Sequence, residues 1–309
     1  MQPPGPGKPP PGVVFDCAMS GMGDALALAM LYALEGKNEA RVLSVSVSRP
    51  SLKAAIFCDL LARFYGGFGR FPIGLAAGAG VADEGAWLAA IVDRKDAAGE
   101  MLYPRGIQKF TDTGLVPAVA RNVLTAQFDG NAIVILTGPA TNLAKMLELS
   151  GVKELIAAKV RALHLLEDGL HGDAAAARKL FAGWPTPIVM VGPEVGAAIP
   201  YPASSFDKDF AWAPNHPLVD GYRAAGAGDV RVSAAAAALH AVRPDAGLFK
   251  LSDAGAIQVG DDGRARFAVS AGGRHRVLSA DLAQRDSVIQ AYTELASARP
   301  NRQPRPRRG

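Results

Sequence analysis

The sequence is poor in cysteine and has no long apolar run, and both shortages limit what the protein can be. Cys17 and Cys58 are its two cysteines, each in an apolar stretch and outside any CxxC pair. A disulfide framework and a thiolate metal site are therefore excluded, and we expect two buried free thiols. No apolar run reaches the roughly 20 residues that cross a bilayer. We expect no membrane partner, and either a cytoplasmic protein or an exported one whose signal peptide was removed before Met1.

A basic surface is also lacking over most of the chain. The net charge is +4, but the last eight residues hold four arginines, at positions 302, 305, 307 and 308. Without them the remaining chain is close to neutral, so the charge describes a tail. We therefore expect no nucleic-acid partner.

The composition between the two ends is that of a protein with a large core. Hydrophobic residues make up 49% of the 309 residues and charged residues 20%. We expect a disordered Pro/Gly leader over 1–12 and a disordered basic tail over 300–309. The middle has no repeat and no linker rich in proline and glycine. The sequence therefore predicts one domain over 13–299.

Short apolar runs rich in β-branched residues alternate with helical runs rich in alanine and leucine. Six such repeats predict an α/β fold with a mainly parallel, Rossmann-like sheet covered by helices on both faces. Near the C-terminus, "AIQVGDDGRARFAVS" predicts a β-hairpin that turns at 261–263, and a last helix is predicted over about 279–297.

Parallel sheets of this kind bind ligands at the carboxyl ends of their strands, so the residues that follow each predicted strand are informative. Asp16 and Asp24 flank the turn after the first strand, in "FDCAMSGMGDALAL". "LTGPATNLA" follows a central strand and contains Thr137 and Asn142. The five histidines show no metal-binding spacing, and His171 alone follows a strand near this edge.

These two stretches resemble the motifs of the inosine/uridine-preferring nucleoside hydrolases, whose first motif is approximately DxDxGxDDAxAL and whose second is similar to GPLTNLA. "SVSVSRPSLKAA", "FPIGLAAGAG" and "DAAAARKLFAGWPTPIVMVG" resemble further family segments in the same order. Together they cover most of residues 13–245. The resemblance implies the nucleoside hydrolase fold, and a homodimer or homotetramer.

The resemblance also implies a chemistry, namely calcium-assisted hydrolysis of an N-glycosidic bond. In the family, carboxylates and a threonine carbonyl hold a calcium ion that binds a water and the ribose diol, and an aspartate deprotonates that water. A hard cation with about 6–8 oxygen ligands suits this task, because it orients the water and makes it more acidic.

Carried over residue by residue, the resemblance leaves this site incomplete. Asp16 and Asp24 match the first and last motif aspartates, and Thr137 matches the threonine whose carbonyl binds the metal. The second motif aspartate falls on Ala18 and the presumed base on Gly23. The late metal aspartate falls on Ala234, in a stretch from 230 to 244 without an acid.

The substrate contacts are changed in part. Glu167 matches a family glutamate, Gly169 stands where an asparagine is expected, and Arg49 replaces the asparagine after the second strand. Asn142, in the second motif, is a further candidate contact. Asp24 and Thr137 alone are too few to hold calcium, so we expect no cofactor and the loss of calcium. A cation at Arg49 would partly replace the lost charge by pairing with Asp16 or Asp24, or by binding an anionic ligand.

Three hypotheses follow from these residues. The first is a nucleoside-hydrolase homologue that has lost the calcium-dependent reaction and retains a pocket for a sugar-like or nucleoside-like molecule, or acts as a scaffold. The second is an active hydrolase that uses Asp16, Asp24, Glu167 or His171 without the usual metal. The third is an unrelated α/β binding protein, which a different strand order would indicate. For Asp24 alone, a carboxylate favoured by the helix dipole is an equally good interpretation.

Overall fold

The computed structural model describes residues 9–66, 72–78, 85–226 and 228–300. The leader over 1–8 and the tail over 301–309, which we expected to be disordered, lie outside these residues. The amide nitrogen of Asn131 donates to the carbonyl oxygens of Pro9 and Pro10, at 3.3 and 3.2 Å. The first strand opens at Gly12.

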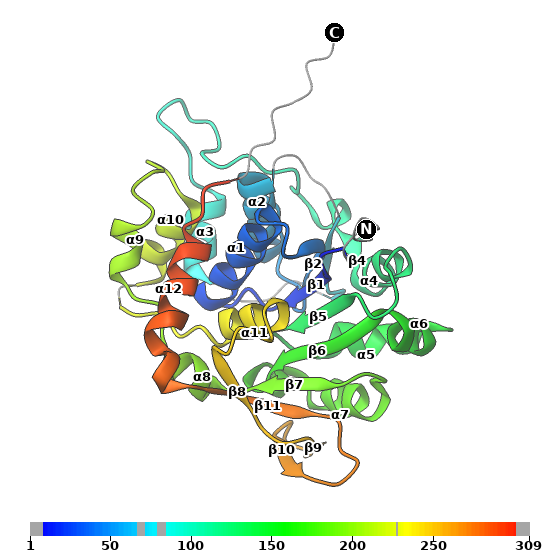
Figure 1. Cartoon of the computed structure of the whole chain (residues 1–309). Coiled ribbons are helices and arrows are strands. Elements are labelled where there is room, and N and C mark those ends of the chain that lie inside the picture. Colours follow the sequence, from blue (N-terminus) through cyan, green and yellow to red (C-terminus); the bar gives the residue numbers. More distant parts are fainter. Residues whose placement is uncertain (1–8, 67–71, 79–84, 227, 301–309) are drawn as a thin grey trace, which may run out of the picture.

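A nine-stranded sheet forms the centre of the fold, in the order β4-β3-β2-β1-β5-β6-β7-β11-β8 (Figure 1). All neighbours are parallel except β8, which pairs antiparallel with β11. The predicted α/β class and mainly parallel sheet are thus confirmed. The strands are β1 (Gly12–Cys17), β2 (Arg41–Val47), β3 (Ile73–Leu75), β4 (Gly114–Leu115), β5 (Ala132–Leu136), β6 (Val160–Leu166), β7 (Ile188–Val191), β8 (Phe249–Leu251) and β11 (Arg276–Ala280).

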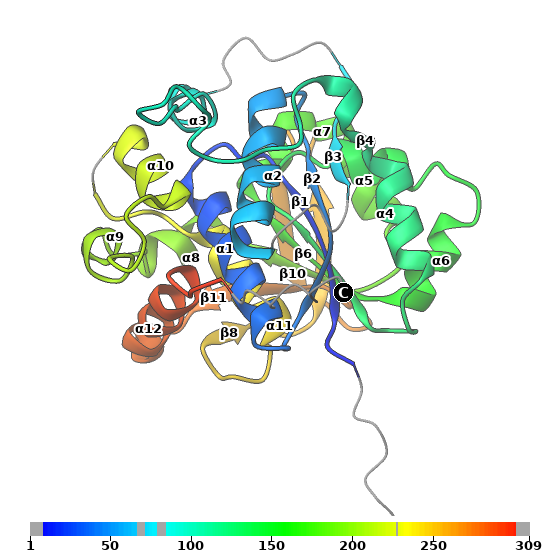
Figure 2. The same ribbon diagram turned by 90° about the horizontal axis from the view of Figure 1, so that it is seen from above.

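Helices cover both faces of the sheet, as Figure 2 shows from above. One layer contains α1 (Met22–Gly36), α2 (Leu52–Gly66), α3 (Ala86–Val92), α8 (Pro193–Ala198), α9 (Ser204–Lys208), α10 (Pro217–Ala225), α11 (Ser233–Val242) and α12 (Arg285–Ala296). The other contains α4 (Val116–Thr125), α5 (Thr141–Met146), α6 (Val152–Lys159) and α7 (Ala174–Gly183). Each layer encloses its own hydrophobic cluster against the sheet. Strands β1 and β5 are therefore buried along their whole length, which explains their continuous apolar runs.

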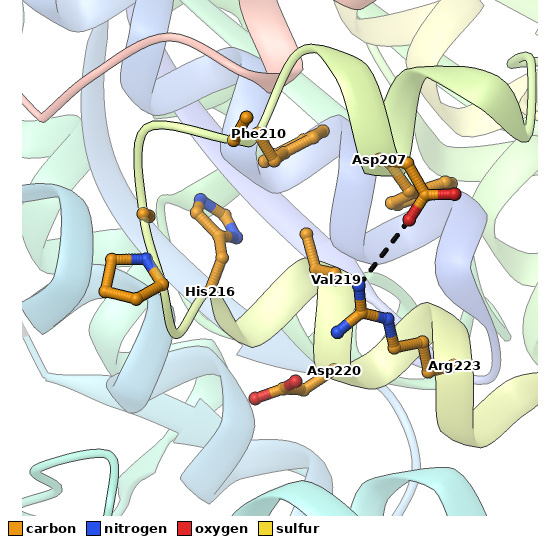
Figure 3. Close-up of a pocket in the computed structure, with 10 residues that line it drawn as sticks. Asp207, Phe210, His216, Val219, Asp220 and Arg223 are labelled. Atoms are coloured by element: carbon orange, nitrogen blue, oxygen red, sulfur yellow. Dashed lines mark hydrogen bonds and ion pairs between the residues drawn. The ribbon is translucent and has the colours of Figure 1, made fainter.

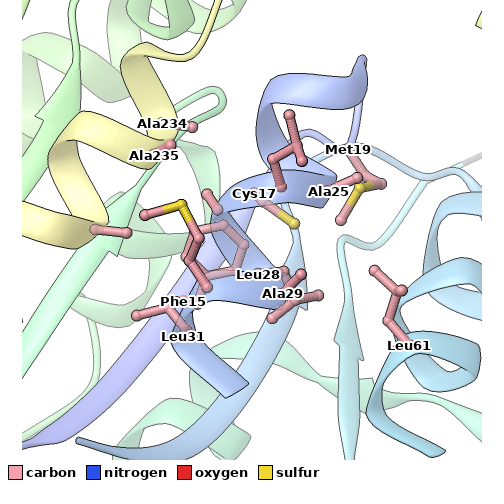
Figure 4. Close-up of a cluster of buried hydrophobic side chains, with 14 of the residues drawn as sticks. Phe15, Cys17, Met19, Ala25, Leu28, Ala29, Leu31, Leu61, Ala234 and Ala235 are labelled. Carbon is pink, nitrogen blue, oxygen red and sulfur yellow. The ribbon is translucent and has the colours of Figure 1, made fainter. Parts of the chain in front are cut away.

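Helix α1 is the central helix of the larger layer. It packs against α2, α11 and α12, and Asp24 is its one charged residue between Met22 and Leu34. A helix that is apolar all round must be buried on all sides. Figure 4 shows Ala25, Leu28 and Ala29 of α1 between β1 and the neighbouring helices. Both cysteines are free and buried in this cluster, as predicted.

The C-terminal part was predicted correctly in its hairpin and incorrectly at the start of its last helix. Strands β9 (Gly255–Val259) and β10 (Ala265–Val269) pair antiparallel around the expected turn. Residues 279 and 280 belong to β11 instead of the helix, which begins at Arg285. The physical reason is that Leu278 is buried beside β7, so this short segment extends the sheet. Within the described ranges, no helix has the length and apolar character needed to span a membrane.

Candidate functional site

The loops that follow β1, β5 and β6 meet at one edge of the sheet, because these strands are neighbours and parallel. Asp16 lies beside Ser46 of β2 and Leu136 of β5 in the strand register. The amide nitrogen of Thr137 donates to the carbonyl oxygen of Asp16 at 2.9 Å. The topology thus places the β1–α1 turn next to the Thr137 segment, with Glu167 at the end of the adjoining strand β6.

Asp16 is enclosed below this edge, with 1% of its surface exposed. The side-chain amide of Asn142 donates to its Oδ1 at 3.1 Å and to the carbonyl oxygen of Val47 at 3.3 Å. Burial raises the pKa of Asp16 to about 7, although the hydrogen bond from Asn142 acts in the opposite direction. Asn142 is itself buried, and its hydrogen bond holds the carboxyl group of Asp16 in place.

Asp24 is the second buried carboxylate, at the start of α1. Its Oδ2 accepts a hydrogen bond from the backbone nitrogen of Ser20 at 3.1 Å. Burial raises the pKa of Asp24 to about 6, and the negative charge of Asp168 raises it further. The side chain of Thr137, the Ser20 amide and the positive charge of Arg49 lower it. The pKa of Asp24 is therefore set by its own turn and by groups from three other loops.

Arg49 reaches into the β1–α1 turn from the end of β2. Its Nε donates to the carbonyl oxygen of Ala18 at 2.7 Å, and one terminal nitrogen donates to that of Met19 at 3.3 Å. The guanidinium of Arg49 is thus bound to the backbone of the β1–α1 turn at Ala18, the position where the family resemblance puts a metal ligand.

Further acidic groups line the site beside Glu167. The pKa of Glu167 is raised by partial burial and by the negative charges of Glu194 and Asp168, while His171 lowers it. Sequence reasoning did not single out Asp168 or Glu194. Glu194 lies in the first turn of α8, shortly after the end of β7, so the rule that pointed to the residues after β1 and β5 would have found it.

The positions where the resemblance expects side chains are occupied by closely packed backbone. A Cβ atom at Gly23 would lie 2.8 Å from the carbonyl oxygen of Arg231. A Cβ atom at Gly169 would lie 2.8 Å from the carbonyl oxygen of Gly138 and 3.0 Å from that of Thr137. These contacts leave no room for a side chain at either glycine without a backbone shift.

Ala234 is likewise closely packed, in helix α11. It is 3% exposed, and it lies at the first turn of α11, where α11 packs on α1. Figure 4 shows Ala234 and Ala235 together at this end of α11. The segment that would supply the late aspartate is therefore apolar and packed.

These residues do not fit a calcium ion. A calcium site needs about 6–8 oxygen ligands, several of them anionic. In the part of the chain that the structure describes, no group of three or more acidic, histidine or cysteine residues is arranged to hold a metal ion. The carbonyl of Thr137 faces the backbone of Gly169, and Asp24 already accepts a backbone hydrogen bond.

A separate small hollow lies between α9 and α10 and contains none of these residues. Figure 3 shows Phe210, His216 and Val219 in its wall, with an ion pair of 3.5 Å between Asp207 and Arg223. Its other carboxylate, Asp220, is bound by Tyr103 and by Arg94. Its charged groups are paired within the fold, so it gives no indication of a ligand.

Comparison with solved structures identifies the fold. A plant nucleoside hydrolase superposes with a TM-score of 0.70 and 19% identity, over 94% of this chain and 100% of that one. The inosine-uridine preferring nucleoside hydrolase from Bacillus anthracis gives 0.68 and 16%, over 93% and 99%. The type III effector protein XopQ, complexed with adenosine diphosphate ribose, gives 0.65 and 12%, over 94% of each chain.

The chain therefore has the nucleoside hydrolase fold, as the sequence motifs indicated. The different fold that would have indicated an unrelated α/β protein is not found, because the chain superposes on these enzymes over nearly its whole length. No family model matches the sequence, and no curated protein matches it. At these identities the likeness concerns the fold alone.

Proposed function

We propose that this protein is a nucleoside hydrolase homologue that does not perform calcium-dependent N-glycosidic hydrolysis and instead binds a small molecule of the nucleoside or pentose class. The ligand would lie at the carboxyl ends of β1, β5 and β6. Glu167 and Arg49 would contact it, and Asp16 and Asp24 would line the floor of the site. In this proposal the protein is a pseudoenzyme of the glycosidase type.

The observation that carries the proposal is the contact between Gly23 and Arg231. A Cβ atom at position 23 would lie 2.8 Å from the carbonyl oxygen of Arg231, so close backbone packing stands against a side chain at the position of the presumed base. Ala18 and Ala234 are buried in the same region and supply no carboxylate. Catalytic groups that act as a unit fail together, so the loss of the base and of two ligands leaves a very small rate.

The choice of ligand class is supported by the fold and by what remains of the site. The XopQ structure contains adenosine diphosphate ribose, so one protein of this fold binds a nucleotide with ribose units. Here Glu167 is partly buried and has a raised pKa, as carboxyl groups at functional sites often do. A carboxylate suits the hydroxyl groups of a sugar, and a guanidinium suits a polar or anionic substituent.

The proposal is tested by calorimetry and by an assay of ribose release. We expect no calcium binding, no release of ribose from inosine, uridine or adenosine, and binding of at least one of adenosine, ribose or adenosine diphosphate ribose. Glu167→Gln should weaken that binding, and Glu154→Gln, on α6, is the matched control. Tight calcium binding together with ribose release would contradict the proposal.

A second candidate is an active hydrolase that works without the metal. It is favoured by one observation, the raised pKa values of Asp16 and Asp24, at about 7 and about 6. Carboxyl groups that titrate near neutral pH are suited to general acid–base catalysis. If ribose release is detected, Asp24→Asn and Glu167→Gln should each abolish it; an unchanged rate in both variants would exclude this candidate.

A further inference from the structure

The β1–α1 turn contains a strained residue. Met19 has a φ of 46°, in the left-handed region that a residue with a side chain rarely adopts. Its side chain is fully buried, so Met19 is enclosed by the surrounding structure. Such a conformation is strained and persists only where the surroundings hold it.

Arg49 supplies the hydrogen bonds that hold this conformation. Its guanidinium donates to the carbonyl oxygens of Ala18 and Met19, which belong to the two peptide groups that flank the Cα atom of Met19. A planar guanidinium has its donors in a fixed fork and reaches two acceptors at once, which an ammonium group does less well. Hydrogen bonds from a charged donor are stronger than those between neutral groups.

The backbone around Arg49 fixes where this fork lies. The amide nitrogen of Ser48 donates to the carbonyl oxygen of Cys17 at 2.8 Å, which ties the end of β2 to the end of β1. Pro50 follows and restricts the backbone of Arg49 to extended conformations. The amide nitrogen of Ser51 then donates to the carbonyl oxygen of Arg49 at 2.8 Å. Two backbone hydrogen bonds and Pro50 therefore fix the backbone of Arg49 beside the turn.

The charge of Arg49 also matches the surroundings. Asp24 lies at the end of the same turn, where its carboxylate accepts from Ser20, and Asp168, Glu167 and Glu194 lie at the neighbouring loops. The positive charge of Arg49 lowers the pKa of Asp24 and so favours its ionised form. The guanidinium is bound by the carbonyl oxygens of Ala18 and Met19, and carbonyl oxygens are also ligands of metal cations.

We propose that Arg49 is a built-in cation, which fixes the β1–α1 turn through the carbonyl oxygens of Ala18 and Met19 and so replaces the structural part of a metal ion's role. This inference rests on the proposed function, since it presupposes a site that does not take up calcium. It makes Arg49 a positioning residue, and it makes the shape of the site independent of divalent cations.

The test is amide hydrogen exchange at Ser20, whose amide is bonded to Asp24 within the turn. In Arg49→Ala, we expect this amide to exchange about tenfold faster or more, which corresponds to the loss of one charge-assisted hydrogen bond. The matched control is Arg243→Ala. Arg243 forms an ion pair with Glu39 through two hydrogen bonds of 2.6 and 2.9 Å, on a different part of the surface. Its loss should leave the Ser20 amide unchanged relative to its neighbours.

Chemical rescue separates a cation role from simple packing. Methylguanidinium chloride should restore protection of Ser20 in Arg49→Ala, while sodium chloride at the same concentration should not. Arg49→Lys should give an intermediate rate. If Arg49→Ala does not fold, Arg49→Gln is measured in its place with the same expectation.

Unchanged Ser20 exchange in the Arg49 variants, or equal rescue by both salts, would overturn the inference. These measurements are made without calcium. A failure of the proposed function appears instead in the calcium titration of the unaltered chain, so the two can fail independently.

Discussion

The Nε2 atom of His164 and the Nδ1 atom of His240 lie 3.1 Å apart, buried between β6 and α11. One ring must donate and the other accept, so at least the accepting ring is neutral. Burial lowers the pKa of His164 far below its usual value, and the pKa of His240 is lowered to about 4, again mainly by burial. Neither ring can take up a proton without disturbing the contact between the sheet and α11.

The histidine pair predicts acid sensitivity. Because the folded-state pKa values lie below the ordinary value of 6.5, the unfolded state binds more protons, and the contribution of this pair to stability is lost as the pH falls below about 6.5. His240→Leu alone should lower the free energy of unfolding by about 1–3 kcal/mol, since it leaves His164 buried without its partner. The double variant with His164→Leu should recover much of this loss and reduce the pH slope, as measured by urea unfolding at several pH values. Additive losses in the double variant would contradict this account.

Asp16 predicts a pH dependence of the opposite sign. Its pKa is raised from 3.8 to about 7, so its favourable contribution is complete below about pH 4 and is lost as the pH rises through 7. Asp16→Asn, which can still accept a hydrogen bond from Asn142, should stabilise the protein at pH 8 by an amount on the order of a few kcal/mol. The gain should shrink toward pH 5 in thermal unfolding measured at both pH values. A gain that is equal at the two pH values would show that the charge of Asp16 is not its cause.

The contact of Gly169 with Thr137 and Gly138 predicts intolerance of any side chain. Gly169→Ala would place a Cβ atom 2.8 Å from a backbone oxygen, and backbone cannot move aside as a flexible side chain does. We expect a loss of about 2 kcal/mol or more. Gly21→Ala is the matched control, because no atom lies within 4 Å of a Cβ at that position. Similar losses in the two variants, measured by urea unfolding, would argue against the close packing.

The family resemblance predicts a homodimer or homotetramer. Size-exclusion chromatography with light scattering should therefore give a mass of two or four times the 32.1 kDa chain. The measurement is best repeated over a range of protein concentrations, since dissociation at low concentration would indicate a weak interface. A monomer at all concentrations would contradict the prediction.

Much of the fold could be predicted from local patterns. The continuous apolar runs at "GVVFDC" and "NAIVIL" indicate strands covered on both faces, and β1 and β5 are such strands. The pair β9 and β10 turns where the Asp-Asp-Gly sequence indicates. Strand β11 was missed because its five residues carry too weak a pattern of hydrophobicity. Its burial beside β7 is a tertiary effect.

The candidate site was predictable in its chemistry but not in its packing. The sequence by itself determined that Ala18, Gly23 and Ala234 carry no carboxylate, because side-chain identity needs no coordinates. Tertiary structure decided what fills those positions. The carbonyl of Arg231 meets Gly23, and the guanidinium of Arg49 meets the carbonyls of Ala18 and Met19. These contacts join segments that are far apart in the sequence. They depend on how β1, β2 and α11 come together, and no local pattern encodes that arrangement.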